Sequence, residues 1–129
     1  MSEVHGWVGY AVVAVFAIGW LWPLGAVIAR RGPGERYWSW VTVEQVVAGL
    51  QVVIGIVLLV IGRRPTDWLH LVYGFGPIAI LVVAHALARD LQKVQPGARP
   101  IQPWVPFAFA AFICFGLTLR GLMTGLGIG

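Results

Sequence analysis

WSWVTVEQVVAGLQVVIGIVLLVIG, residues 38–62, is the stretch of sequence that decides the fold. Glu44 is its one charged residue. A helix that crosses the hydrocarbon core of a bilayer needs about 20 apolar residues, so this run is long enough to span a membrane. We expect a helix rather than a strand, because a helix satisfies its backbone polar groups within its own segment.

Three further apolar runs of similar length lie at about 6–29, 67–91 and 104–126. The connections between the four runs, at about 30–37, 63–66 and 90–103, are short and contain prolines or glycines that favour turns. Short connections place consecutive helices antiparallel to each other. The sequence therefore predicts one transmembrane domain, residues 1–129, of the all-α class, folded as an up-down bundle of four transmembrane helices.

The composition supports a membrane protein. Of the 129 residues, 59% are hydrophobic and 11% are charged, whereas about 25% are charged in a typical soluble domain. These values exclude a soluble globular domain and a disordered chain. The single cysteine, Cys114, excludes an intramolecular disulfide. No basic run is interleaved with aromatic residues, so we expect the lipid bilayer as partner and no nucleic acid.

The distribution of charge predicts how the bundle lies in the membrane. Cytoplasmic loops carry an excess of Lys and Arg. Six of the nine basic residues lie in or beside the first and third connections, whereas the second holds Arg63 and Arg64. We therefore expect a multi-pass protein of the inner (cytoplasmic) membrane with both termini on the extracytoplasmic side. The six are Arg30, Arg31, Arg36, Arg89, Lys93 and Arg99.

Two histidines predict a cofactor site in the outer half of the bundle. Ionisable groups inside a membrane cost about 2.5–3.5 kcal/mol each on insertion scales, so they mark functional positions. His5 and His70 lie near the start of the first and third runs, which are parallel to each other. Two facing imidazoles are suited to be the axial ligands of haem b. The alternative is that His5 is a solvated terminal residue and that His70 reaches the lipid headgroups.

Other residues near that end complete the predicted haem site. Arg120 lies in the fourth run and is expected, with Arg63 or Arg64, to meet the haem propionates. Gly74 and Gly121 would leave room for the porphyrin plane, and Met123 is a substitute axial ligand. The metal in this interpretation is iron held by His70 and His5.

A second polar group is expected in the inner half. Glu44 and Gln51 are seven residues apart and share one face of a helix, which we expect to point into the bundle. The third run places His85 at a depth similar to that of Glu44. A carboxyl paired with an imidazole can relay protons near neutral pH, so Glu44, His85 and Gln51 are candidate relay residues. The alternative is that these side chains join the helices by hydrogen bonds alone.

Several enzyme classes find no support in the sequence, which holds no H-E-x-x-H metalloprotease motif, no cysteine pair and no phosphate-binding loop. Three functions stay open. The most concrete is a subunit for electron transfer, linked to haem b or a quinone and with bis-histidine ligation. The second is an oligomeric transporter or channel for a small solute or protons, favoured by the Glu44 and Gln51 face and by Pro77 within the third run. The third is a structural accessory subunit of a larger membrane complex.

Overall fold

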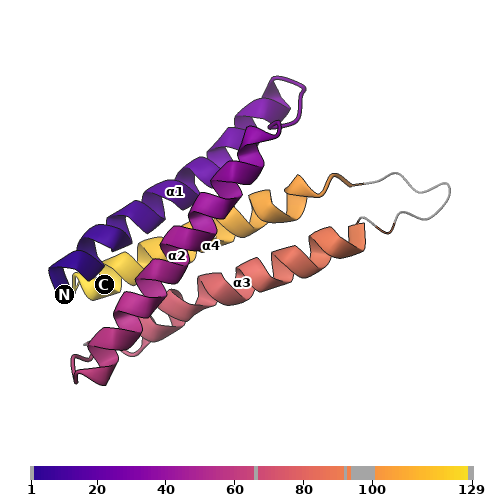
Figure 1. Cartoon of the computed structure of the whole chain (residues 1–129). Coiled ribbons are helices and arrows are strands. Elements are labelled where there is room, and N and C mark those ends of the chain that lie inside the picture. The colour runs from indigo at the N-terminus through magenta and orange to yellow at the C-terminus, as the bar shows by residue number, and fades with distance from the viewer. Residues whose placement is uncertain (1, 66, 92, 94–100, 128–129) are drawn as a thin grey trace.

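The computed structural model describes residues 2–65, 67–91, 93 and 101–127. Over these residues the chain forms four helices and no strand (Figure 1): α1 (Ser2–Ile28), α2 (Arg36–Val60), α3 (Leu69–Leu91) and α4 (Trp104–Gly125). All four are long and apolar enough to cross a membrane. The prediction of an all-helical fold with four helices long and apolar enough to span a membrane is thereby confirmed. Arg99, one of the six basic residues, lies outside the described residues.

The helix ends explain why the chain reverses direction so tightly. After α2, Gly62 has a φ of 89°, and its N–H donates to the carbonyl of Leu59. The N–H of Arg63 donates to the carbonyl of Leu58. This pair of bonds is a Schellman motif, in which a left-handed residue ends the helix and turns the chain back. Arg30, with a φ of 60°, ends α1 in the same way.

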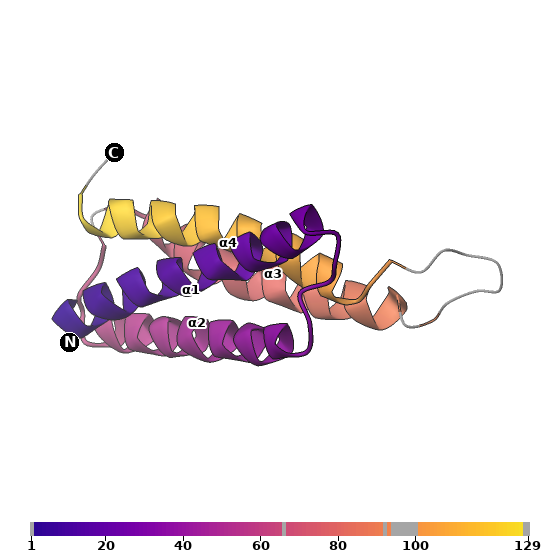
Figure 2. The ribbon, with the colours of Figure 1, turned by 90° about the horizontal axis from the view of Figure 1, so that it is seen from above.

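The four helices are arranged in the order α2, α1, α4, α3 around the bundle. α1 packs against α2 and α4, and α4 packs against α3, whereas α2 and α3 have the least extensive contact of the four neighbouring pairs. Figures 1 and 2 show that α1 begins and α4 ends at the same end of the bundle. The helices α1 and α3 are therefore parallel and stand diagonally across the bundle.

Small residues allow the most extensive of these contacts, between α3 and α4. A methyl group built at Gly121 would lie 3.3 Å from Cβ of Tyr73, and one built at Gly125 would lie 3.1 Å from Cε1 of His70. The G-x-x-x-G spacing on α4 thus lets α3 approach closely. Pro77 lies inside α3 and has no N–H to donate to the Tyr73 carbonyl. That carbonyl faces Gly121.

Two buried clusters form the interior. The one in the middle of the bundle joins all four helices, and the other lies nearer the connection between α1 and α2. Many large apolar side chains instead lie on the outer surface of the bundle, as suits contact with lipid chains. The middle cluster consists of Val12, Phe16, Ala48, Leu81, Ala111 and Cys114, and the second of Tyr37, Val41, Ala84, Ala88, Phe107 and Ala110.

Candidate functional site

A cavity of about 360 Å³ lies between the four helices, at the end of the bundle where α1 begins and α4 ends. Pockets that bind small molecules and cofactors have volumes of about 300–1,000 Å³ and mostly apolar walls with a few polar groups. Each of the four helices contributes at least one glycine to the wall of this cavity, which makes room for a ligand between them. These glycines are Gly6, Gly9, Gly55, Gly74, Gly121 and Gly125.

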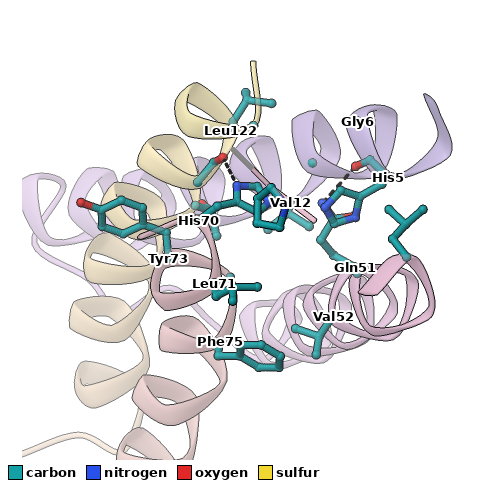
Figure 3. Close-up of a pocket in the computed structure, with 18 of the residues that line it drawn as sticks. His5, Gly6, Val12, Gln51, Val52, His70, Leu71, Tyr73, Phe75 and Leu122 are labelled. Carbon is teal, nitrogen blue, oxygen red and sulfur yellow. Dashed lines mark hydrogen bonds between the residues drawn. The ribbon is translucent and has the colours of Figure 1, made fainter. Parts of the chain in front are cut away.

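His5 of α1 and His70 of α3 meet in this cavity (Figure 3). Their ring centroids are 5.9 Å apart, and the ring planes make an angle of 69°. Both side chains are half-buried. The structure thus brings together the two imidazoles that the sequence predicts in the outer half of the bundle. His5 lies within α1, three residues after its first residue, rather than in an unstructured terminus.

Hydrogen bonds hold the ring of His70 and leave one of its nitrogens available. Nδ1 lies 2.9 Å from the carbonyl oxygen of Gly121 and 3.1 Å from Oγ1 of Thr124. Since a carbonyl only accepts, Nδ1 donates its proton to Gly121, and Nε2 of the neutral ring keeps its lone pair. A backbone carbonyl bonded to the far nitrogen is the arrangement that orients histidines toward metals.

The surroundings of His5 include polar atoms with no partner among the described residues. Nε2 of Gln51 donates to the backbone carbonyl of His5 at 2.9 Å. Nδ1 of His5 and Oε1 of Gln51 are both buried without a hydrogen bond. Leaving a buried polar atom unpaired costs about 1–3 kcal/mol, so such atoms mark places where a ligand or water belongs. Both atoms belong to residues that line the cavity.

The predicted cation and glycine positions divide into two groups. Arg63, Arg64 and Gly74 line the cavity. Arg120 and Met123 are not among the described residues of its wall. The guanidinium of Arg120 instead lies 5.9 Å from the ring centroid of Tyr73, and its Nη1 is 3.9 Å from the sulfur of Met123. Arg63 and Arg64, rather than Arg120, therefore provide positive charge at the cavity.

Glu44 lies one helical turn beyond the cavity, in the core of the bundle. Its side chain has no exposed surface, and neither carboxyl oxygen has a hydrogen-bond partner among the described residues. A methyl group built at Gly19 of α1 would overlap the Glu44 carboxyl group. The Tyr37 hydroxyl, also fully buried, donates to the carbonyl of Gly19 at 2.6 Å. Glu44 therefore occupies space that only a glycine on α1 leaves open.

The described residues contain no hydrogen bond between Glu44 and His85, the two residues that the sequence offers as a candidate pair for proton relay. His85 is exposed, and its Nε2 lies 3.0 Å from Nε2 of Gln45. Its ring also contacts the ring of Phe107, with centroids 5.0 Å apart. The reason is the rotation of α2 about its axis, since successive residues of a helix point about 100° apart. Glu44 consequently faces α1, while the next residue, Gln45, faces α3.

Sequence reasoning did not find the contact of Tyr37 with Gly19. Tyr37 precedes Glu44 by seven residues, so both lie on the same face of α2. That spacing was the available signal, because two polar side chains on one face of an apolar helix point toward a common neighbour. Which glycine of α1 receives them depends on how the two helices cross.

Comparison with protein-family models, with curated proteins and with solved structures finds no match for this chain. The arguments about function therefore rest on the geometry of the cavity and of the groups around it.

Proposed function

We propose that this chain is a small membrane haem protein that carries single electrons, with His5 and His70 as the axial ligands of a b-type haem. One observation carries the proposal: two imidazoles from diagonal helices face each other, with centroids 5.9 Å apart, in a cavity lined by glycines. A metal ion held between two imidazoles, with metal–nitrogen bonds of about 2 Å, would separate the ring centroids by about 6 Å.

The number of protein ligands favours haem over a bare metal ion. Among the described residues, no three His, Cys, Asp or Glu side chains gather into a group that could hold a metal ion. Sites built from protein side chains alone use three or four ligands. Two imidazoles suffice where a porphyrin supplies the remaining four. When bound, the haem supplies the one-electron chemistry.

The remaining residues of the cavity have roles in binding and orientation. The carbonyl of Gly121 and the hydroxyl of Thr124 keep the proton of His70 on Nδ1, so that Nε2 is the ligating nitrogen. His5 would be the second ligand, and its Nδ1 is buried without a hydrogen bond among the described residues. Arg63 and Arg64 supply positive charge for the haem propionates at the turn between α2 and α3.

The proposed location is the inner membrane, with the cavity at the extracytoplasmic end. The support is the excess of Arg and Lys in the first and third connections, which the positive-inside rule assigns to the cytoplasm. An electron carrier needs a donor and an acceptor, so we expect this chain to work with a redox partner in a homo-oligomer or larger membrane complex.

The test is an absorption spectrum of the detergent-purified protein, produced with ample haem, first air-oxidised and then reduced with dithionite. We expect a Soret band, sharp α and β bands on reduction, and one haem per chain. His5→Ala and His70→Ala should each lose the bis-histidine spectrum, whereas His85→Ala should keep it because His85 lies outside the cavity wall. A featureless visible spectrum, or bands that survive both substitutions, would overturn the proposal.

A further inference from the structure

Glu44 is a buried ionisable residue outside the cavity, and the proposed function gives it no role. Its side chain is completely buried, and both carboxyl oxygens lack hydrogen-bond partners among the described residues. An unpaired charge in an apolar interior is so costly that the group takes up a proton instead. Gly19, which admits the carboxyl group, shows that the helices make room for this side chain rather than exclude it.

The groups that surround Glu44 cannot neutralise it. The titratable side chains near it are Tyr37 on its own helix and Cys114 on α4. The Tyr37 hydroxyl donates to the Gly19 carbonyl, and the Cys114 thiol lies 3.6 Å from the carbonyl of Pro77. The side chains that α1 and α3 contribute to the middle cluster are apolar, among them Phe16 of α1 and Leu81 of α3.

The chemistry of the surroundings selects a proton over a metal cation. Hard cations such as Ca²⁺ and Mg²⁺ need six or more oxygen ligands, from carboxylates, carbonyls or water. Glu44 is the only carboxyl group among the described buried residues. The nearby carbonyl of Gly19 is already bonded by Tyr37. A proton needs no such ligand shell.

The position of Glu44 connects it to the cavity rather than to the opposite end. Ala48, one turn further along α2, lines the cavity, which places Glu44 about 6 Å along the helix axis from its wall. Toward the other end lie the buried Tyr37 and the half-buried Trp22, whose ring centroids are 5.8 Å apart. The Trp22 indole N–H donates to the carbonyl of Pro33.

We propose that Glu44 is a proton-binding site in the bundle core that exchanges its proton through the cavity. The site also responds to charge in the cavity, an extension that rests on the proposed haem. An electron added there would favour the protonated carboxyl group, because it would cancel positive charge that stabilises a nearby carboxylate. Glu44 would thereby take up a proton on reduction and release it on oxidation. The charge of the proton compensates the charge of the electron.

The first test follows the proton directly and needs no haem. The chain has three glutamates, Glu3, Glu35 and Glu44. Glutamate labelled with ¹³C at the side-chain carboxyl should give three NMR signals, whose changes with pH report protonation. Glu3 and Glu35 are exposed and serve as internal controls. We expect the third signal, which Glu44→Gln removes, to remain in the protonated position at a pH where the controls are carboxylates, and to shift as the pH rises further.

The outcome that contradicts the proton site is a Glu44 signal that follows the two controls or never shifts while the protein stays folded. Because the titration is recorded on the unmutated chain, it stands even if Glu44→Gln folds poorly. In that case Glu44→Asp, which keeps a carboxyl group in the core but carries no labelled glutamate, also removes the signal and assigns it.

The second test separates the link to the cavity from the proton site itself. In the haem-loaded protein, the midpoint potential should fall as the pH rises through the titration of Glu44. In Glu44→Gln the midpoint potential should not change over this pH range and should equal that of the unmutated protein with Glu44 protonated. The control variant Glu35→Gln should show the same pH dependence as the unmutated protein. A potential with the same pH dependence in Glu44→Gln would overturn the link. Absence of haem would overturn the proposed function and leave the NMR result standing.

Discussion

The imidazole of His5 lies edge-on to that of His70, with the ring centroids 5.9 Å apart, where the diagonal helices α1 and α3 face each other. Each ring also lies over a glycine of another helix. Gly55 of α2 faces Cε1 of His5, and Gly125 of α4 faces Cε1 of His70. The pair is therefore positioned by all four helices, and changes on α2 or α4 should disturb it without removing either histidine.

Gly55→Leu should displace His5 and abolish most haem binding. A Cβ at this position would lie 3.3 Å from Cε1 of His5, so the longer leucine side chain has no room unless the ring moves. Gly49→Leu, on the same helix, is the matched control, since nothing lies within 4 Å of a Cβ there. The haem-to-protein ratio of the purified variants measures the effect. Equal ratios for both variants would show that the ring of His5 is not held at Gly55.

Thr124→Val should weaken haem binding by about tenfold. The substitution removes the hydroxyl 3.1 Å from Nδ1 of His70 but leaves the bond to the Gly121 carbonyl. Loss of one group that orients a metal ligand typically costs about 10–100-fold in affinity, and the remaining bond favours the lower value. Haem titration of the apoprotein provides the measurement. Thr42→Val, whose hydroxyl bonds only its own helix, should leave the affinity unchanged.

Gly19→Ala should lower the free energy of unfolding by about 1–3 kcal/mol, the usual cost of overfilling a packed core. The added methyl group would overlap the carboxyl group of Glu44 and lie 3.0 Å from Cβ of Ala111. Gly25→Ala is the control on the same helix, because a Cβ there meets nothing within 4 Å. Denaturant titration in detergent should also show partial recovery in the double variant Gly19→Ala/Glu44→Ala. Equal stability of the two single variants would disprove the close contact with Glu44.

Tyr37→Phe should lower the free energy of unfolding by about 1 kcal/mol. The variant keeps the buried ring but loses the hydroxyl that donates to the Gly19 carbonyl at 2.6 Å. Single hydrogen bonds between membrane helices contribute about 0.6 kcal/mol on average and up to about 1.7. Tyr10→Phe, at a ring that is half exposed, should change the stability by much less. The same denaturant titration compares the two, and an unaltered Tyr37→Phe protein would contradict the assignment.

The orientation in the membrane can be measured with cysteines, because the native Cys114 is fully buried and should stay unreactive. Arg64→Cys lies at the end where α1 begins, and Glu35→Cys lies at the opposite end; both positions are exposed. A membrane-impermeant maleimide added to intact cells should label Arg64→Cys, whereas Glu35→Cys should react only after the cells are opened. The reverse pattern would place the cavity at the cytoplasmic end.

The parts of the candidate site that could be predicted are those that depend on depth. Counting along the runs from their ends places His5 and His70 in the outer half of the bundle, and the structure brings them together. The pairing of Glu44 with His85 was predicted from depth as well, yet His85 contacts Gln45. Depth follows from the rise of a helix along its axis, whereas pairing also requires that each helix is rotated the right way.

The sequence by itself determined the number of helices, their lengths and their up-down order, because hydrophobic length and short loops leave no other arrangement of the backbone in a bilayer. Only the tertiary structure decided which faces point inward. In a soluble bundle an amphipathic stripe sets that rotation, but these helices are apolar around most of their circumference. Their rotation is set instead by the fit of small residues, as where Gly19 admits Glu44 and Gly125 lies against His70.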